Sequence, residues 1–90
     1  MLTLPAHLTH EQAVPASLAL RLALSGDADA TVVVDASGLQ TFDSSALAVL
    51  IACRREVLAS GRNFAVKGLH ERLRQLAGLY GVEPLLPASA

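Results

Sequence analysis

Residues 42–53 form the most informative stretch of this sequence; they read FDSSALAVLIAC. A short oxygen-bearing side chain at Asp43 or Ser44 can accept a hydrogen bond from a free N–H in the first turn of a helix. The turns that follow are apolar on nearly every side, whereas a surface helix normally carries one apolar stripe. The stretch therefore predicts a helix from about Ser44 to Ser60 that packs on a sheet by one face and has a docking face opposite.

The two sides of this predicted helix differ in the size of their side chains. One side carries the larger apolar residues Leu47, Leu50, Ile51 and Leu58. The other side carries mainly smaller residues, namely Ala48, Val49, Ala52 and also Arg55. Small residues permit close helix contact inside the chain or with a partner, so the periodicity leaves open whether the second side is core or interface.

Strands and helices alternate along the rest of the chain. The run Thr31–Asp35 is continuously β-branched up to its last residue, which predicts a strand covered on both faces. Shorter strands are expected at residues 2–4 and 63–66, and further helices from Thr9 or His10 to Ser25 and from His70 to Tyr80. This alternation is typical of an α/β domain with right-handed crossovers.

Length and composition exclude several classes of protein. The chain has 90 residues, which suits one small domain, and a net charge of -1, which disfavours binding to nucleic acid. The longest unbroken apolar run, Ala46 to Cys53, is too short to span a membrane, and Met1 is not followed by a secretory leader pattern. We therefore expect a cytoplasmic protein without direct membrane insertion.

Few side chains suggest catalysis. Ser44 lacks the flanking glycines of a hydrolase elbow, so it is either a helix cap or a site of phosphorylation or contact. His7 and His10 are three residues apart but have no further ligands in a metal-binding pattern, and His70 is placed to cap the third helix. Cys53 is expected to be a small apolar group within its helix. No catalytic residue, cofactor or metal is predicted.

Two segments around the central helix resemble the signature of STAS domains. Residues 35–39 read DASGL and residues 42–47 read FDSSAL, which matches a strand ending in Asp-x-Ser followed by Asp-Ser-small-small-Leu. The resemblance extends from Leu2 to about Pro87, within one domain over residues 1–90. Residues 66–87 are similar to those of MlaB-like STAS subunits of the Mla phospholipid ABC transporter. The chain departs from the family at Ala46, where glycine is usual.

The resemblance implies a small mixed β-sheet with helices packed mainly on one face. It also implies a non-enzymatic accessory subunit that binds the cytoplasmic ATPase of an Mla-type transporter and serves outer-membrane lipid asymmetry. Such a protein lies in the cytoplasm, peripheral to the inner membrane through its partner. Without that partner, an apolar docking face predicts a homodimer. The contact residues carried over by position are Asp43, Ser44, Ser45, Ala48, Val49 and Ala52.

A second function is compatible with the same family resemblance. In an anti-sigma factor antagonist, Ser44 would be the switch residue that an anti-sigma factor kinase phosphorylates. A phosphate there would place negative charge on an apolar docking face and so weaken binding. An enzyme or nucleotide-binding module is a third reading; the sequence has no Gly-rich phosphate loop, although the resemblance leaves weak nucleotide binding open.

Overall fold

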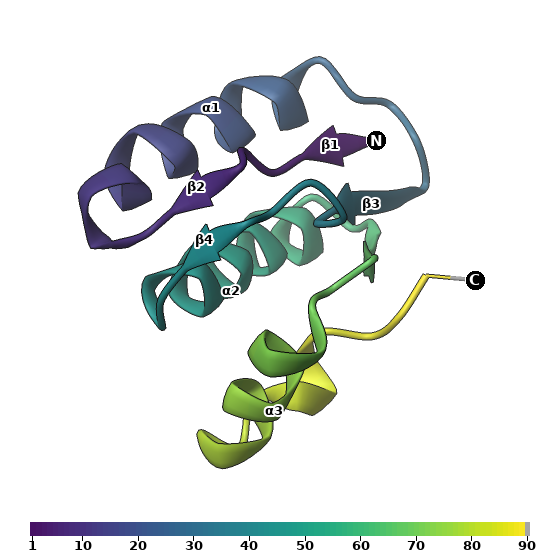
Figure 1. Cartoon of the computed structure of the whole chain (residues 1–90). Helices are drawn as coiled ribbons and strands as arrows, with labels where there is room; N and C mark the ends of the chain where they lie inside the picture. The colour runs from purple at the N-terminus through teal and green to yellow at the C-terminus, as the bar shows by residue number, and fades with distance from the viewer. Residues whose placement is uncertain (90) are drawn as a thin grey trace.

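Three parallel strands form the sheet in the computed structural model, which describes residues 1–89 (Figure 1). Strand β3 (Thr31–Asp35) lies in the middle, between β1 (Leu2–Thr3) and β5 (Asn63–Lys67). The predicted α/β class is confirmed. The sheet differs from the mixed arrangement that the resemblance implied, because every pairing within residues 1–89 is parallel, including the bridge between Val66 and Ala88.

Helices connect the strands and cover one face of the sheet. Helix α1 (Ala13–Ser25) packs against β1, and helix α2 (Ser45–Ala59) packs against α1 and β5. Along β3, Val32 and Val34 are fully buried, whereas Thr31 is exposed. Val33 and Asp35, on the same face as Thr31, are half-buried. The expectation that β3 is covered on both faces is therefore wrong, because burial alternates along the strand and is complete on one face only.

A second, smaller pair of strands was not predicted. Strand β2 (His7–Leu8) pairs in parallel with β4 (Thr41–Phe42). Two-residue strands are too short to produce a recognisable alternation, so they depend on their tertiary partner. This pair brings the chain before α1 beside the chain before α2.

The ends of the helices agree closely with the sequence. The first helical segment begins as a 3₁₀ turn, η1 (His10–Gln12), and Gln12 Oε1 accepts the backbone N–H of Thr9 at 2.9 Å. Helix α3 (Glu71–Leu79) is capped by His70, whose Nδ1 accepts the N–H of Arg72 at 3.0 Å, as predicted. A second 3₁₀ turn, η2 (Glu83–Leu85), follows α3.

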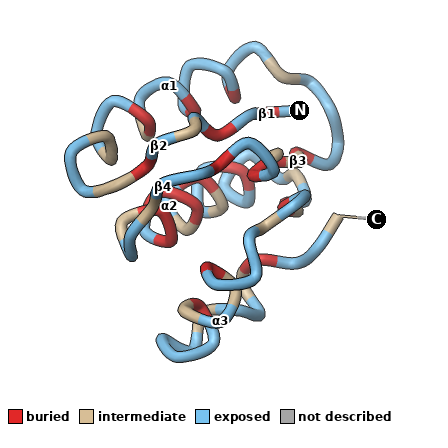
Figure 2. The backbone as a smooth tube through the Cα atoms, in the orientation of Figure 1, coloured by how far each residue is buried: buried red, intermediate tan, exposed pale blue. Residues whose placement is uncertain are grey.

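The core is centred on α2 and entirely apolar among the described residues (Figure 2). The α2 residues buried in it are Ala46, Leu47, Val49, Leu50, Cys53 and Val57. Full burial of a Val or Leu side chain contributes about 1.5–3 kcal/mol relative to exposure. Leu58, which the periodicity placed with Leu47 and Leu50, is instead 43% exposed near the end of the helix.

Candidate functional site

Asp43 holds the beginning of α2 in place. Its Oδ1 accepts the backbone N–H of Ser45 at 2.8 Å, and its Oδ2 accepts the backbone N–H of His10 at 3.0 Å. The hydrogen bond from Ser45, followed by that from His10, lowers the pKa of the Asp43 carboxyl. One carboxylate thus satisfies N–H groups at the start of both α2 and η1, which fixes the geometry of the loop between β4 and α2.

Ser44 occupies the N-cap position of α2, but its side chain makes no capping hydrogen bond. The sequence left Asp43 and Ser44 as alternative caps, and the structure gives this role to the Asp43 side chain. Ser44 is exposed to solvent. Its hydroxyl is therefore accessible at the start of the helix, where the helix dipole favours negative charge.

Side-chain contacts also order the turn after β3 and the residue that precedes Asp43. After β3, Asp35 Oδ1 accepts both the backbone N–H and the hydroxyl of Ser37, at 2.9 and 2.6 Å. Phe42, directly before Asp43, lies with its ring centroid 5.3 Å from that of His70, and the Arg72 guanidinium lies 5.4 Å from the Phe42 centroid. The Asp35–Ser37 contacts therefore shape the turn after β3, and the Phe42 contacts place the residue before Asp43 against the start of α3.

The predicted contact residues separate into two groups. Ala48 and Ala52 are exposed on α2, and Ser45 is half-buried at its first turn. Val49 is 3% exposed and packs between α2 and α1, so it does not offer an outward surface. Val49 was included among the contact residues because the family resemblance carried it over by position, and in the structure α1 covers this position.

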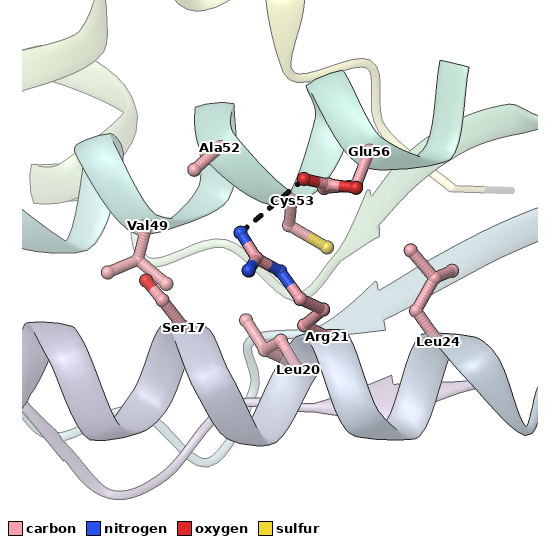
Figure 3. Close-up of a pocket in the computed structure, with 8 residues that line it drawn as sticks. All are labelled: Ser17, Leu20, Arg21, Leu24, Val49, Ala52, Cys53 and Glu56. Carbon is pink, nitrogen blue, oxygen red and sulfur yellow. Dashed lines mark hydrogen bonds and ion pairs between the residues drawn. The ribbon is translucent and has the colours of Figure 1, made fainter. Parts of the chain in front are cut away.

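A narrow cleft runs between α1 and α2 (Figure 3). Its lining residues are Ser17, Leu20, Arg21, Leu24, Val49, Ala52, Cys53 and Glu56. The ion pair between Arg21 Nη2 and Glu56 Oε1, at 3.5 Å, crosses it from one helix to the other (Figure 3). Its accessible volume of about 30 Å³ is far below the roughly 300–1,000 Å³ of small-molecule sites.

Cys53 lies in this cleft and is 7% exposed. Burial, followed by the nearby Glu56 carboxylate, raises the pKa of its thiol to about 11. The thiolate is the reactive form of cysteine, so this environment suppresses nucleophilic chemistry. The structure agrees with the interpretation of Cys53 as a small buried group of the helix.

The sequence did not single out the outer face of α1. Val14, Leu18 and Leu22 are exposed there, although each is a large apolar residue. Their spacing of four residues is visible in the sequence, alongside the buried set Ala16, Leu20 and Leu24. The sequence did contain a signal for this exposed face, namely two apolar stripes on one helix. Packing on a sheet requires only one stripe, so the second was available for another contact.

No cluster of three or more His, Cys, Asp or Glu side chains within residues 1–89 is placed to hold a metal ion. None of the helices in that range is long and apolar enough to cross a bilayer.

Comparison with known proteins adds one finding to this geometry. No curated protein matches this chain. A family model described as "Mlab, STAS domain" matches residues 1–87, a range that includes the Asp35–Ser37 turn, the Asp43 cap and all of α2. The match covers nearly the whole sequence, and the chain therefore belongs to the MlaB-type STAS domain family.

Proposed function

We propose that this protein is a non-enzymatic accessory subunit that binds the ATPase of an Mla-type phospholipid ABC transporter. The contact site is the outward side of the start of α2, which we call the α2 surface and define as Asp43, Ser44, Ser45, Ala48 and Ala52. The observation that carries the proposal is the exposure of Ala48 and Ala52 one turn apart on a helix whose other side is buried. Membership of the MlaB-type family supports this choice of partner.

The shape of the α2 surface suits close docking. Alanine at positions 48 and 52 leaves the helix backbone near the surface, so a partner element can approach without displacing large side chains. The Asp43 contacts with Ser45 and His10 order the preceding loop before binding. Preordering reduces the entropy lost on association, which favours affinity. In this proposal the protein works in the cytoplasm, held at the inner membrane by the transporter.

The proposal is tested by measuring binding to the Mla-type ATPase subunit from the same genome. Ala48→Glu places a charged side chain on the α2 surface at an exposed helical position, so the fold is retained while docking is blocked. The matched control is Ala28→Glu, the same change at an exposed alanine in the loop before β3. We expect loss of binding for the first variant and wild-type binding for the second.

Two results would count against this function. One is a wild-type protein that shows no affinity for the ATPase at micromolar concentrations. The other is equal binding by Ala48→Glu and Ala28→Glu, which would move the contact away from α2.

A second candidate function is an anti-sigma factor antagonist. The observation that favours it is the exposed Ser44 side chain, which is free of any capping bond and so accessible to a kinase. Phosphorylation would place about −1.5 to −2 charges next to the Asp43 carboxylate and on the α2 surface. Incubation with an anti-sigma factor kinase from the same genome, followed by mass spectrometry, tests this; a Ser44→Ala variant is the control, and unmodified wild-type protein would exclude the switch.

A further inference from the structure

The outer face of α1 carries an apolar stripe, which we define as Val14, Leu18 and Leu22. These side chains are 71%, 54% and 75% exposed. Among the described residues, seven large apolar side chains are exposed, and three of them lie on this one helix face. We propose that the α1 stripe is the main apolar contact for the same ATPase subunit, an inference that rests on the proposed function.

The α1 stripe and the α2 surface adjoin the same cleft. Ser17 and Arg21 of α1 line one wall, and they directly precede Leu18 and Leu22 in the helix. Ala52 of the α2 surface lines the opposite wall (Figure 3). Because neighbouring helical positions differ by about 100°, Leu18 and Leu22 lie on the solvent side of Ser17 and Arg21. A partner that covers Ala48 and Ala52 and extends across the cleft therefore reaches the stripe.

The area required for a stable complex favours this extension. Specific interfaces bury about 800 Å² on each partner. Alanine and serine side chains dominate the α2 surface and supply a small part of such an area. The α1 stripe adds three large side chains that are each more than half exposed. The partner's matching surface should thus be apolar where it meets α1, and closely fitting where it meets α2.

The same area argument weighs against a second copy of this chain as the occupant. Pairing α1 with α1 would cover the stripe and leave the α2 surface outside the contact, so a second copy would use only one of the two adjoining surfaces toward the roughly 800 Å² that a specific interface buries on each partner. The cleft itself is also too small for a separate ligand, since its accessible volume is about 30 Å³. It has room for the tip of one partner side chain beside the Arg21–Glu56 ion pair.

The test uses Leu18→Glu and Leu22→Glu, with Leu79→Glu as the matched control. Leu79 is 83% exposed and belongs to α3, so the control makes the same chemical change away from the cleft. We expect the dissociation constant for the ATPase subunit to rise at least tenfold for each α1 variant and to change less than twofold for the control. Leu18→Ala and Leu22→Ala, which introduce no charge and keep helix propensity, should weaken binding in the same direction.

The outcomes separate this inference from the proposed function. If the α1 variants bind like the wild type while Ala48→Glu does not bind, the inference is overturned and the proposed function stands. If the wild type does not bind the ATPase, both fall. Light scattering on the free protein tests the alternative occupant, a second copy of this chain. If the wild type is a dimer, Leu22→Glu is a monomer and the affinity for the ATPase is unchanged, the stripe serves self-association and the inference is overturned.

Discussion

The Asp43 carboxylate accepts a hydrogen bond from the backbone N–H of His10, which lies 33 residues earlier in the chain, at 3.0 Å between nitrogen and Oδ2. Its other oxygen accepts the N–H of Ser45 at the start of α2. The start of η1 and the start of α2 are therefore joined through one side chain. Asp43, which belongs to the family signature, therefore connects the segment that follows β2 with the segment that follows β4.

Replacing Asp43 should loosen both helix starts together. In Asp43→Ala, the N–H groups of His10 and Ser45 lose their acceptor, so the melting temperature falls and amide exchange at both positions accelerates. Asp43→Asn keeps one side-chain acceptor and should lie between this variant and the wild type. Thermal unfolding and hydrogen exchange measure the two effects.

The control for this prediction is Asp29→Ala, which removes an exposed carboxylate from the loop before β3. It should leave exchange at His10 and Ser45 unchanged. Faster exchange at Ser45 alone in Asp43→Ala would show that the contact with His10 contributes nothing to order in solution.

Stability should decrease on acidification. The pKa of Asp43 is lowered by hydrogen bonds from Ser45 and His10, that of Asp35 by Ser37, and that of Asp27 chiefly by the backbone of Asp29. Below the unfolded-state pKa of 3.8, the unfolded chain binds more protons than the native protein. The stabilisation that these three carboxylates provide is therefore fully present above pH 3.8. It is lost as the pH falls through their lowered pKa values in the native protein.

Urea unfolding at a series of pH values between about 7 and 3 measures this dependence. The free energy of unfolding should decline toward the acid end, and Asp43→Ala should decline less steeply, because it lacks one of the responsible groups. An equal slope in the variant would show that Asp43 titrates alike in the folded and unfolded states.

Gly68 should tolerate no side chain. Its φ is +69°, and a Cβ at this position would lie 2.8 Å from Cβ and 3.1 Å from Cα of Ser37. The left-handed backbone costs a non-glycine residue about 1–2 kcal/mol, and the contact with Ser37 adds to it. Gly68→Ala should therefore lower the free energy of unfolding by about 2 kcal/mol or more, measured by urea titration.

Gly61→Ala is the matched control for the contact with Ser37. Gly61 has a similar φ of +78°, but a Cβ there would meet nothing within 4 Å. Its substitution should cost about 1–2 kcal/mol, from backbone strain alone. If Gly68→Ala and Gly61→Ala lower the free energy of unfolding equally, the close contact between residue 68 and Ser37 makes no contribution.

Cys53 should react slowly in the native protein. With a pKa of about 11 and a 7% exposed side chain, it forms little thiolate at pH 8. Labelling by a disulfide reagent should be at least about 100-fold slower in the folded protein than in urea, where the thiol has its ordinary pKa near 8.5. Comparable rates in both conditions would mean that the cleft between α1 and α2 opens readily.

Much of the fold could be predicted from local sequence patterns. The Thr31–Asp35 strand, the helix that follows Ser44 and the His70 cap agree with the structure, because β-branched runs, apolar periodicity and capping side chains act over a few residues. The β2–β4 pair was missed because each strand is two residues long. The incomplete cover on the β3 face that carries Thr31 and Val33 was missed, because a β-branched run can form a strand whether one or both of its faces are covered.

The sequence by itself determined the order of the three helices and the three strands of the main sheet, the family signature and the segment that contains the candidate site. The tertiary structure decided which side chains of that segment face outward. It gave the capping role to Asp43 rather than Ser44, placed Val49 against α1, and left Val14, Leu18 and Leu22 exposed. The physical reason is that helical periodicity specifies which residues share a face, whereas burial of that face depends on the neighbour that packs against it.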